Sequence, residues 1–285
     1  MSGVGSTEPP SSGGTGFAGA GAGTDWLAVC RASVADVRRV LEELPTRNER
    51  EPVVGQGLGG DETTAVDQAA EDAIVAHFRD LDVTIISEEV GRLGNGETVV
   101  VIDPIDGSLN AKRGIPFFSL SIAVADGGRM GDVHFGYVYD FGSGEEWVGR
   151  RGEGATVNGE PLGAIRPKDT IEILCFEATR APLIARDAPK VAELAYRLRV
   201  MGSLALSLSH LAAGRVDGVC SLKPARSVDI AAAQLFVREV GLAIELFDDP
   251  RAFEEAELDL EGRSRVAAAG TAELCRQVAD ALSGR

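Results

Sequence analysis

The sequence predicts an α+β protein in which layers of helices and sheets are stacked on one another. Three observations support this class. Apolar residues recur at helical spacing over residues 27–44. Short apolar runs punctuated by glycines follow over residues 83–139, and predicted strands alternate with helices from Pro167 onward. Helices and sheets in both halves favour stacked layers, with a functional site at their junction.

The first half, residues 24–166, is expected to contain two helices followed by a sheet. Residues 1–23 are rich in Gly, Ser, Thr and Pro and are expected to form a disordered tail. Thr24 is the predicted N-cap of the first helix, which Pro45 ends. A second helix is predicted at about residues 64–78. Strands are predicted at residues 83–86, 98–102, 118–125 and 132–139, with a hairpin-like segment at residues 146–155.

The second half, residues 167–285, alternates predicted strands and helices. Strands are predicted at residues 171–176, 216–222, near 243–247 and near 265–268. Helices are predicted at residues 189–198, 203–213, 228–240 and from Thr271 onward. No internal repeat is visible in either half.

The balance of charged residues argues against some kinds of ligand and indicates a high-salt environment. The chain has 44 acidic and 28 basic residues, a net charge of −16, which argues against general binding to nucleic acids or anionic membranes. Only four of the basic residues are lysines. An acidic, lysine-poor composition suits a cytoplasm with very high salt, where the repulsion between like charges is screened. We therefore expect a cytoplasmic protein from a haloarchaeal or similar halophilic source.

The cysteines and histidines do not indicate a zinc site or a disulfide framework. The four cysteines are far apart and lie in apolar runs without a C-x-x-C pair, and there are only three histidines. His210 is expected to pack within a helix. No apolar run approaches the length of a membrane span, and the N-terminus lacks a signal peptide.

The most informative segment is Val-Ile-Asp-Pro-Ile-Asp-Gly-Ser at residues 101–108. Asp103 and Asp106 lie three residues apart at the end of an apolar, strand-like run. Gly107 allows the chain to turn, and Ser108 adds a hydroxyl. Hard divalent cations such as Mg²⁺ need oxygen ligands on a rigid scaffold, which this segment offers. A bare D-x-x-D would more often be a loop with two solvated carboxylates, so its context decides.

Three further acidic segments supply that context. Residues 61–67 precede the second predicted helix, where Asp61 or Thr64 could cap it and Asp67 could cap or orient it. Residues 87–89, Ser-Glu-Glu, end a predicted strand, and Glu89 is either a supporting or a solvated residue. Asp229 begins a helix of small residues. Each segment taken alone is more often a cap or a solvated charge.

Taken together, these segments resemble the inositol monophosphatase family, within the wider group that includes fructose-1,6-bisphosphatases. The resemblance covers the chain from about Asp25 to its end. The matching segments are residues 61–67, 87–89, 102–108, 114–117, 151–155, 158–159, 201–203, 228–232 and 264–269. Ala111 stands where the family usually has an aromatic residue, and Val228 stands where it commonly has Trp. Both departures resemble the archaeal branch, in which inositol monophosphatase and fructose-1,6-bisphosphatase activities often coexist.

The resemblance implies a layered α-β-α-β-α sandwich of the sugar phosphatase type, two to three Mg²⁺ ions, with Mn²⁺ as a possible substitute, and a homodimer. It implies that one ion is held by Glu88, Asp103, the Ile105 carbonyl and Ser108. A second ion would be held by Asp103, Asp106 and Asp229, and a weaker third would lie near Glu88. Two ions can clamp both the attacking and the leaving oxygen of a phosphate monoester.

The resemblance also implies which residues act on water and substrate. Asp61, Glu88 and Ser108 are the expected catalytic residues, which orient the attacking water. The expected substrate-binding residues are Asp106, Gly107, Ser108, Gly202, Ser203 and Arg226. Candidates for contact with a second phosphate are Lys112, Arg113, Lys223 and Arg226, although each could equally be a surface charge.

We therefore expect a Mg²⁺-dependent hydrolase of phosphate monoesters that acts on inositol 1-phosphate, fructose 1,6-bisphosphate or both. One alternative is a phosphatase of 3′-phosphoadenosine 5′-phosphate, which would share the fold and the metal ligands. Another is a non-catalytic interaction protein on the same fold. That alternative is disfavoured because no matched ligand is missing from the sequence.

Overall fold

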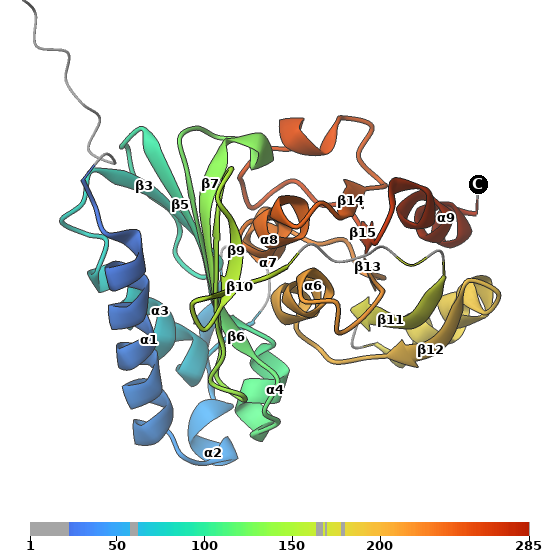
Figure 1. Ribbon diagram of the computed structural model, residues 1–285. Coiled ribbons are helices and arrows are strands. Elements are labelled where there is room, and N and C mark those ends of the chain that lie inside the picture. The colour runs from blue at the N-terminus through green and yellow to red at the C-terminus, as the bar shows by residue number, and fades with distance from the viewer. Residues whose placement is uncertain (1–22, 58–61, 164–167, 169, 178–179, 285) are drawn as a thin grey trace, which may run out of the picture.

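The computed structural model describes residues 23–57, 62–163, 168, 170–177 and 180–284. Within them, helices and sheets alternate in five layers (Figure 1). An eight-stranded sheet separates two outer helices from a central group of helices, and a five-stranded sheet separates that group from a further helix. The predicted α+β class and layered sandwich are confirmed.

The first outer layer consists of α1 (Trp26–Glu43) and α3 (Ala65–Ala76). The apolar side of each helix is buried against the sheet, as the fully buried Val37 and Ile74 illustrate. The predicted N-cap of α1 is wrong by one residue. Asp25 is the cap, because its carboxylate accepts the N–H of Ala28 at 3.1 Å. The short helix α2 (Arg47–Arg50) and the hairpin of β1 (Val53–Gln56) and β2 (Glu62–Thr64) connect the two.

The larger sheet has the strand order β10-β9-β8-β7-β6-β5-β3-β4. All neighbours are antiparallel except β3 and β5, which are parallel. The central strands β5 and β6 are buried along their whole length, as expected for strands covered on both faces. The strands are β3 (Val83–Ser87), β4 (Gly91–Gly94), β5 (Thr98–Asp106), β6 (Ser119–Ala125), β7 (Val133–Asp140), β8 (Glu146–Arg150), β9 (Gly154–Val157) and β10 (Glu160–Pro161). The strands and the hairpin predicted for this half are confirmed.

The second sheet has the order β12-β11-β13-β15-β14. Its strands are β11 (Ile171–Glu177), β12 (Ala195–Arg199), β13 (Gly218–Ser221), β14 (Ala243–Leu246) and β15 (Val266–Ala269). The helices of this half are α5 (Ala181–Asp187), α6 (Leu204–Ala212), α7 (Ser227–Ile230), α8 (Ala233–Glu239) and α9 (Ala272–Ser283). Helices α6, α7 and α8 lie between the two sheets, whereas α9 covers the outer face (Figure 1).

In this half one helix prediction is wrong and another is correct except for a break. The helix predicted at residues 189–198 is instead a 3₁₀ turn (Ala188–Val191) followed by β12, because residues 195–199 pair in parallel with β11. The helix predicted at residues 228–240 is divided into α7 and α8. At the junction the side-chain amide of Gln234 donates to the carbonyl of Ala231, and the N–H of Leu235 donates to the carbonyl of Ala232. The helix predicted from Thr271 onward is confirmed as α9, and Thr271 is its N-cap.

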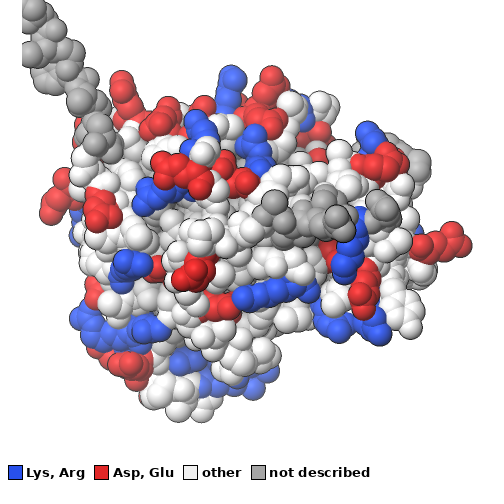
Figure 2. Space-filling model, in the orientation of Figure 1, with Lys and Arg blue, Asp and Glu red and all other residues white. Residues whose placement is uncertain are grey.

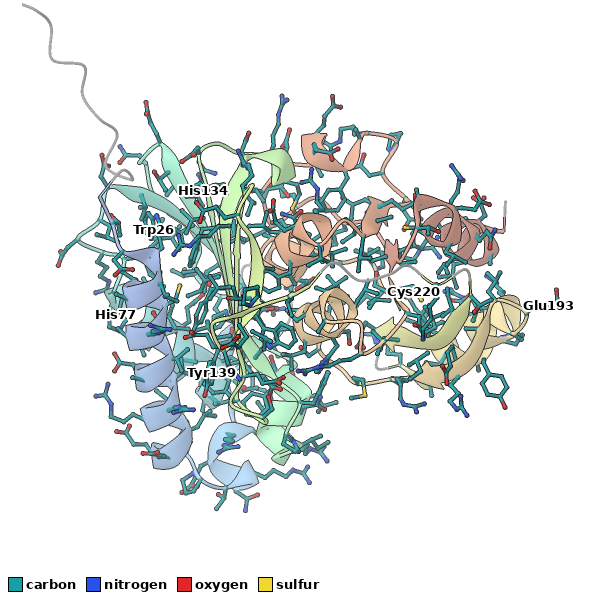
Figure 3. All side chains as sticks on the ribbon, in the orientation of Figure 1. Trp26, His77, His134, Tyr139, Glu193 and Cys220 are labelled. Atoms are coloured by element: carbon teal, nitrogen blue, oxygen red, sulfur yellow. The ribbon has the colours of Figure 1, made fainter. Side chains whose placement is uncertain are left out.

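The core supports the remaining predictions about packing. His210 stacks on Phe117 with ring centroids 5.7 Å apart and meets the edge of Trp147, so it is a packing residue as predicted. All four cysteines are free and buried, and Cys220 lies within the five-stranded sheet (Figure 3). None of the helices in the described part of the chain is long and apolar enough to cross a lipid bilayer.

The surface in view carries charges of both signs, without one continuous basic patch (Figure 2). The predicted disordered tail, residues 1–23, lies almost entirely outside the described residues, as does the predicted boundary between halves at residues 166 and 167. Both remain predictions.

Candidate active site

The turn that follows β5 brings several of the predicted ligands together. The pairing of β5 with β6 is interrupted by a bulge between Asp103 and Asp106, where β5 has one residue more than β6, and pairing resumes at Asp106 opposite Ser119. The carboxylate of Asp103, which is 2% exposed, accepts the backbone N–H of Ile105 at 3.1 Å. The hydroxyl of Ser108 donates to the Ile105 carbonyl at 2.9 Å. The two oxygens predicted to join Asp103 on one ion are therefore neighbours.

Gly107 makes this turn possible. Its φ of 92° lies in the left-handed region, and it is the N-cap of α4 (Ser108–Arg113). A Cβ at this position would lie 3.0 Å from the carbonyl oxygen of Gly202 and 3.1 Å from that of Phe117. Gly107 and Gly202, both predicted to contact the substrate, are thus side by side although they belong to different halves of the chain.

Asp106 is held by the beginning of α6. Its carboxylate accepts the hydroxyl of Ser203 and the backbone N–H of Ala205 at 2.7 Å, with a longer contact to the N–H of Leu204 at 3.4 Å. Negative charge is favoured at a helix N-terminus, where backbone N–H groups lack partners. Asp106 therefore links the first half of the chain to the second. Ser203 contacts Asp106 as well as capping α6.

Glu177 is a buried residue of the site that the sequence analysis did not identify. Its carboxylate accepts the N–H of Gly202 at 2.9 Å and the hydroxyl of Ser207 at 2.6 Å, and it lines the same hollow as Asp106. Burial raises the pKa of Glu177 from 4.5 to about 8, although these hydrogen bonds oppose the rise. Glu177 fixes the turn before α6 and so positions Gly202.

This pKa predicts how stability depends on pH. Because the folded pKa exceeds the unfolded one, the protonated carboxyl favours folding below about pH 4.5, and this contribution is lost as the pH rises to about 8. The loss amounts to at most about 3–5 kcal/mol. We expect the free energy of unfolding of Glu177→Gln to fall less steeply between pH 5.5 and 8 than that of the wild type, in urea titrations without divalent cations.

Glu146→Gln is the matched control. The hydrogen bond from Arg31 lowers the pKa of Glu146, so its contribution is constant above about pH 4.5. The control should run parallel to the wild type over the same interval. A Glu177→Gln curve that is also parallel would contradict the assignment of a raised pKa to Glu177.

Glu88 follows β3 and is positioned by a second residue that the sequence did not single out. Glu71, on α3, accepts the hydroxyl of Ser87 and the backbone N–H groups of Glu89 and Val90. These bonds fix the chain on both sides of Glu88. Glu89 itself accepts the hydroxyl of Thr63, so it is a paired residue and not simply a solvated neighbour.

Arg226 joins Glu88 to Asp229. Its guanidinium donates to Glu88 Oε1 at 2.5 Å and to Asp229 Oδ1 at 3.0 Å, and its backbone N–H donates to Asp229 Oδ2 at 2.7 Å. The Arg226 side chain is only 8% exposed. The sequence predicted Arg226 as a contact for substrate, and its pairing with two predicted metal ligands was not foreseen.

The carboxylates of this site repel one another. Burial, followed by the charges of Glu88, Asp106 and Asp229, raises the pKa of Asp103 well above its usual range. Burial also raises the pKa values of Glu88 and Asp106 to about 7. Four acidic groups thus share one region with insufficient positive charge.

The chemistry of these donors fits a hard divalent cation, since all are oxygens and most are carboxylates. The carboxylates do not yet converge on one point, however. Among the residues described, no three His, Cys, Asp or Glu side chains are grouped closely enough to hold an ion. Arg226 supplies the positive charge between two of the acids instead.

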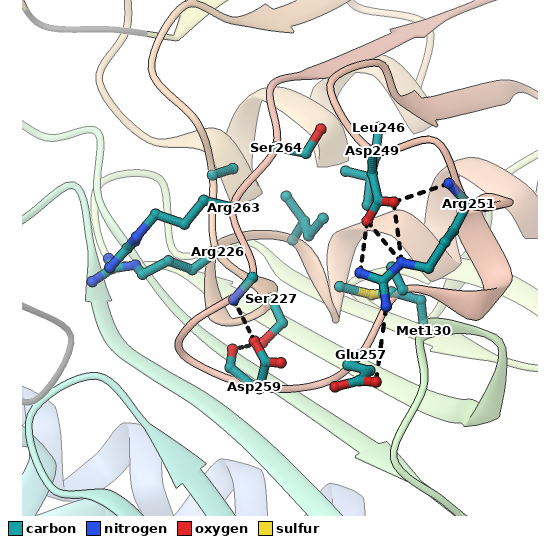
Figure 4. Close-up of a pocket in the computed structure, with 14 residues that line it drawn as sticks. Met130, Arg226, Ser227, Leu246, Asp249, Arg251, Glu257, Asp259, Arg263 and Ser264 are labelled. Carbon is teal, nitrogen blue, oxygen red and sulfur yellow. Dashed lines mark hydrogen bonds and ion pairs between the residues drawn. The ribbon is translucent and has the colours of Figure 1, made fainter.

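A hollow of about 200 Å³ adjoins these residues. Asp106, Gly202 and Asp229 line it, together with the basic residues Lys223, Arg226 and Arg263. Arg263 was not identified from the sequence. Arg226 and Arg263 extend in the same direction, away from the ion pairs of Arg251 with Asp249 and Glu257 (Figure 4).

The other two basic candidates for a second phosphate contact form ion pairs. Lys112 lies 3.5 Å from Asp67, and Arg113 lies 2.9 Å from Glu51. Asp67 accepts the hydroxyl and the N–H of Thr64, so it caps α3, as predicted. Asp61, the remaining predicted catalytic residue, lies outside the described residues.

Comparisons with known proteins point to one family. The sequence model of the inositol monophosphatase family matches residues 27–282 of this chain. A fructose-1,6-bisphosphatase/inositol-1-monophosphatase of Archaeoglobus fulgidus is 34% identical over 249 residues, which cover 86% of this chain and 93% of the relative. The Nus factor SuhB of Escherichia coli is also 34% identical, over 78% of this chain and 85% of the relative.

Solved structures agree with the fold. The crystal structure of an inositol monophosphatase-fructose 1,6-bisphosphatase matches with a TM-score of 0.79 and 27% identity, covering 90% of this chain and all of the other. An inositol monophosphatase of Thermotoga maritima matches with a TM-score of 0.73 and 25% identity, covering 90% of this chain and 97% of the other.

Proposed function

Because the chain belongs to the inositol monophosphatase family and is a phosphomonoesterase of that type, we propose that it hydrolyses inositol 1-phosphate and fructose 1,6-bisphosphate with Mg²⁺. The observation that carries the proposal is the meeting of Glu88, Asp103, Asp106 and Asp229. Burial, followed by the charges of the other three carboxylates, raises the pKa of Asp103, and such a cluster costs stability unless a cation offsets it.

The ligands divide into two overlapping sets. Glu88, Asp103, the Ile105 carbonyl and Ser108 would hold one Mg²⁺, and Asp103, Asp106 and Asp229 would hold another, with a weaker third ion near Glu88. When bound, such ions neutralise phosphate oxygens and make a water molecule acidic enough to supply hydroxide. Mn²⁺ could take the same oxygen ligands.

The chain's own residues orient the reactants. The hydroxyl of Ser108, together with Asp61 and Glu88, would direct the attacking water at phosphorus. The turn at Gly107 would place its N–H and that of Ser108 against the phosphate oxygens. Gly202, fixed by Glu177, would contact the alcohol. A water near Asp106 or Asp229 would return a proton to the leaving oxygen.

The basic side chains beside the site support a substrate with a second phosphate. Lys223 and Arg263 line the hollow that Asp106, Glu177 and Asp229 also line, and Arg226, which is paired with Glu88 and Asp229, lines it too. Basic groups in one hollow of a protein with a net charge of −16 favour an anionic ligand there. The homodimer, the cytoplasmic location and the halophilic source remain predictions.

The substrate proposal is tested by comparing three phosphate esters. Phosphate release would be measured in molar KCl with Mg²⁺ from inositol 1-phosphate, fructose 1,6-bisphosphate and 3′-phosphoadenosine 5′-phosphate. We expect turnover of the first two. Turnover of the nucleotide alone would overturn the substrate assignment but keep the metal site, and no turnover by folded protein would favour a binding role.

A further inference from the structure

Arg226 forms a buried bridge within the acidic cluster. One arm of its guanidinium donates to Glu88 Oε1 at 2.5 Å and the other to Asp229 Oδ1 at 3.0 Å. The three side chains are only 8%, 15% and 18% exposed, in the order Arg226, Glu88 and Asp229. Charge-assisted hydrogen bonds of this kind are strong when they are withdrawn from water.

The local chain geometry fixes this bridge. Arg226 is the N-cap residue of α7, and Asp229 lies three residues later in the first turn. The carboxylate of Asp229 accepts the backbone N–H of Arg226 at 2.7 Å while it also accepts from the guanidinium. The planar guanidinium can therefore reach Glu88, on the other half of the chain, with its remaining arm.

The guanidinium and a divalent cation compete for the same oxygens. Glu88 and Asp229 are both proposed ligands, and each already has an oxygen turned to Arg226. Two positive charges so close together repel each other in a site of low polarity. Among the described residues, no three acidic side chains are grouped closely enough to hold an ion while Arg226 occupies these oxygens.

We propose that Arg226 is a built-in counter-ion, which holds Glu88 and Asp229 together in the metal-free protein and must leave them when a divalent cation binds. The hollow of about 200 Å³ that Arg226 lines gives the displaced side chain room. The inference rests on the proposed function, since it takes Glu88 and Asp229 as ligands. It makes Arg226 a determinant of metal affinity.

The test measures Mg²⁺ binding to the whole protein by titration calorimetry, with thermal unfolding as a second readout. Arg226→Met removes the charge and keeps much of the length. We expect it to bind Mg²⁺ about tenfold more tightly than the wild type, because no cation has to be displaced. We also expect a lower melting temperature without metal and a smaller difference from the wild type at saturating Mg²⁺.

Arg251→Met is the matched control. Arg251 also pairs with an aspartate close by in sequence, Asp249, but outside the acidic cluster, and its removal changes the net charge equally (Figure 4). Its Mg²⁺ affinity should stay within about twofold of the wild type. Arg226→Lys keeps the charge without the planar fork and should lie between the wild type and Arg226→Met; it replaces the latter if that variant does not fold.

The outcomes separate this inference from the proposed function. Unchanged or weaker Mg²⁺ binding by a folded Arg226 variant would overturn the counter-ion role. If Mg²⁺ nevertheless binds the wild type and does not bind Asp103→Asn, the proposed metal site remains supported although the counter-ion role is wrong. Absence of Mg²⁺ binding to wild type and Arg226→Met alike would overturn both.

Discussion

Asp103→Asn is expected to lower the rate of phosphate release by about 10³-fold, because Asp103 is the one carboxylate proposed to bridge both cations and such ions contribute several kcal/mol to the transition state. The fold should survive. Asn can still accept the N–H of Ile105, which Asp103 accepts at 3.1 Å. Replacing a buried acid that three others repel should leave the melting temperature of the metal-free protein unchanged or higher.

Asp187→Asn is the control for this prediction, because its expected effects on melting temperature and turnover are the reverse of those of Asp103→Asn. Asp187 is equally buried but is neutralised by Arg186 and Lys190, away from the proposed ligands. Its replacement should lower the melting temperature and leave turnover nearly unchanged at temperatures where the protein is folded. Full turnover by Asp103→Asn, or a loss of activity in Asp187→Asn equal to that in Asp103→Asn, would contradict the bridging role.

Gly107→Ala is expected to reduce both stability and activity. A side chain at a φ of 92° costs about 1–3 kcal/mol. The new Cβ would also lie 3.0 Å from the backbone oxygen of Gly202, which cannot move without displacing the turn before α6. We therefore expect the free energy of unfolding, measured in urea, to fall by more than the backbone strain alone. The rate should fall because Ser108 shifts.

Gly114→Ala separates the cost of the backbone conformation from the cost of the close contact with Gly202. Gly114, at the other end of α4, has a φ of 70°, but a Cβ there meets nothing within 4 Å. It should show only the cost of the backbone conformation, about 1 kcal/mol, with turnover close to that of the wild type. Equal losses in the two variants would mean that the close approach of Gly107 to Gly202 has no energetic consequence.

The parts of the site that lie on one stretch of chain were predictable. The segment at residues 101–108 contains the proposed ligands, a turn and a hydroxyl in sequence, and the end of β5 keeps the Ile105 carbonyl and the Ser108 hydroxyl within 2.9 Å of each other. Glu71 and Glu177 were missed because each acts through contacts with distant segments, the end of β3 and the turn before α6. A single acidic residue in a helix or at a strand end gives no sign of such a partner.

The long-range partner of Arg226 also could not be predicted from the sequence. Its distance of three residues from Asp229 suggested proximity to the site, but its bond to Glu88 joins positions 138 residues apart. The sequence could place the charge near the carboxylates and could not determine which of them it pairs with. Arg263, from the chain before β15, gave no local signal at all.

The errors in the fold also arise from long-range pairing. Residues 189–198 contain Ala, Glu and Leu, which favour helices, yet residues 195–199 form the edge strand β12 because β11 offers unpaired backbone groups there. By contrast, α1, α3 and α9 were predicted within a few residues, since each carries an apolar stripe and a polar cap within its own sequence.

The most direct test of the central claim is phosphate release from inositol 1-phosphate and fructose 1,6-bisphosphate by metal-stripped protein, as Mg²⁺ is added back in molar KCl. A metal-dependent phosphatase should release no phosphate in the presence of a chelator, and its rate should rise with added Mg²⁺ until the metal sites are saturated. Turnover at full rate in chelator would contradict the account, as would no turnover of either ester at saturating Mg²⁺ by folded protein.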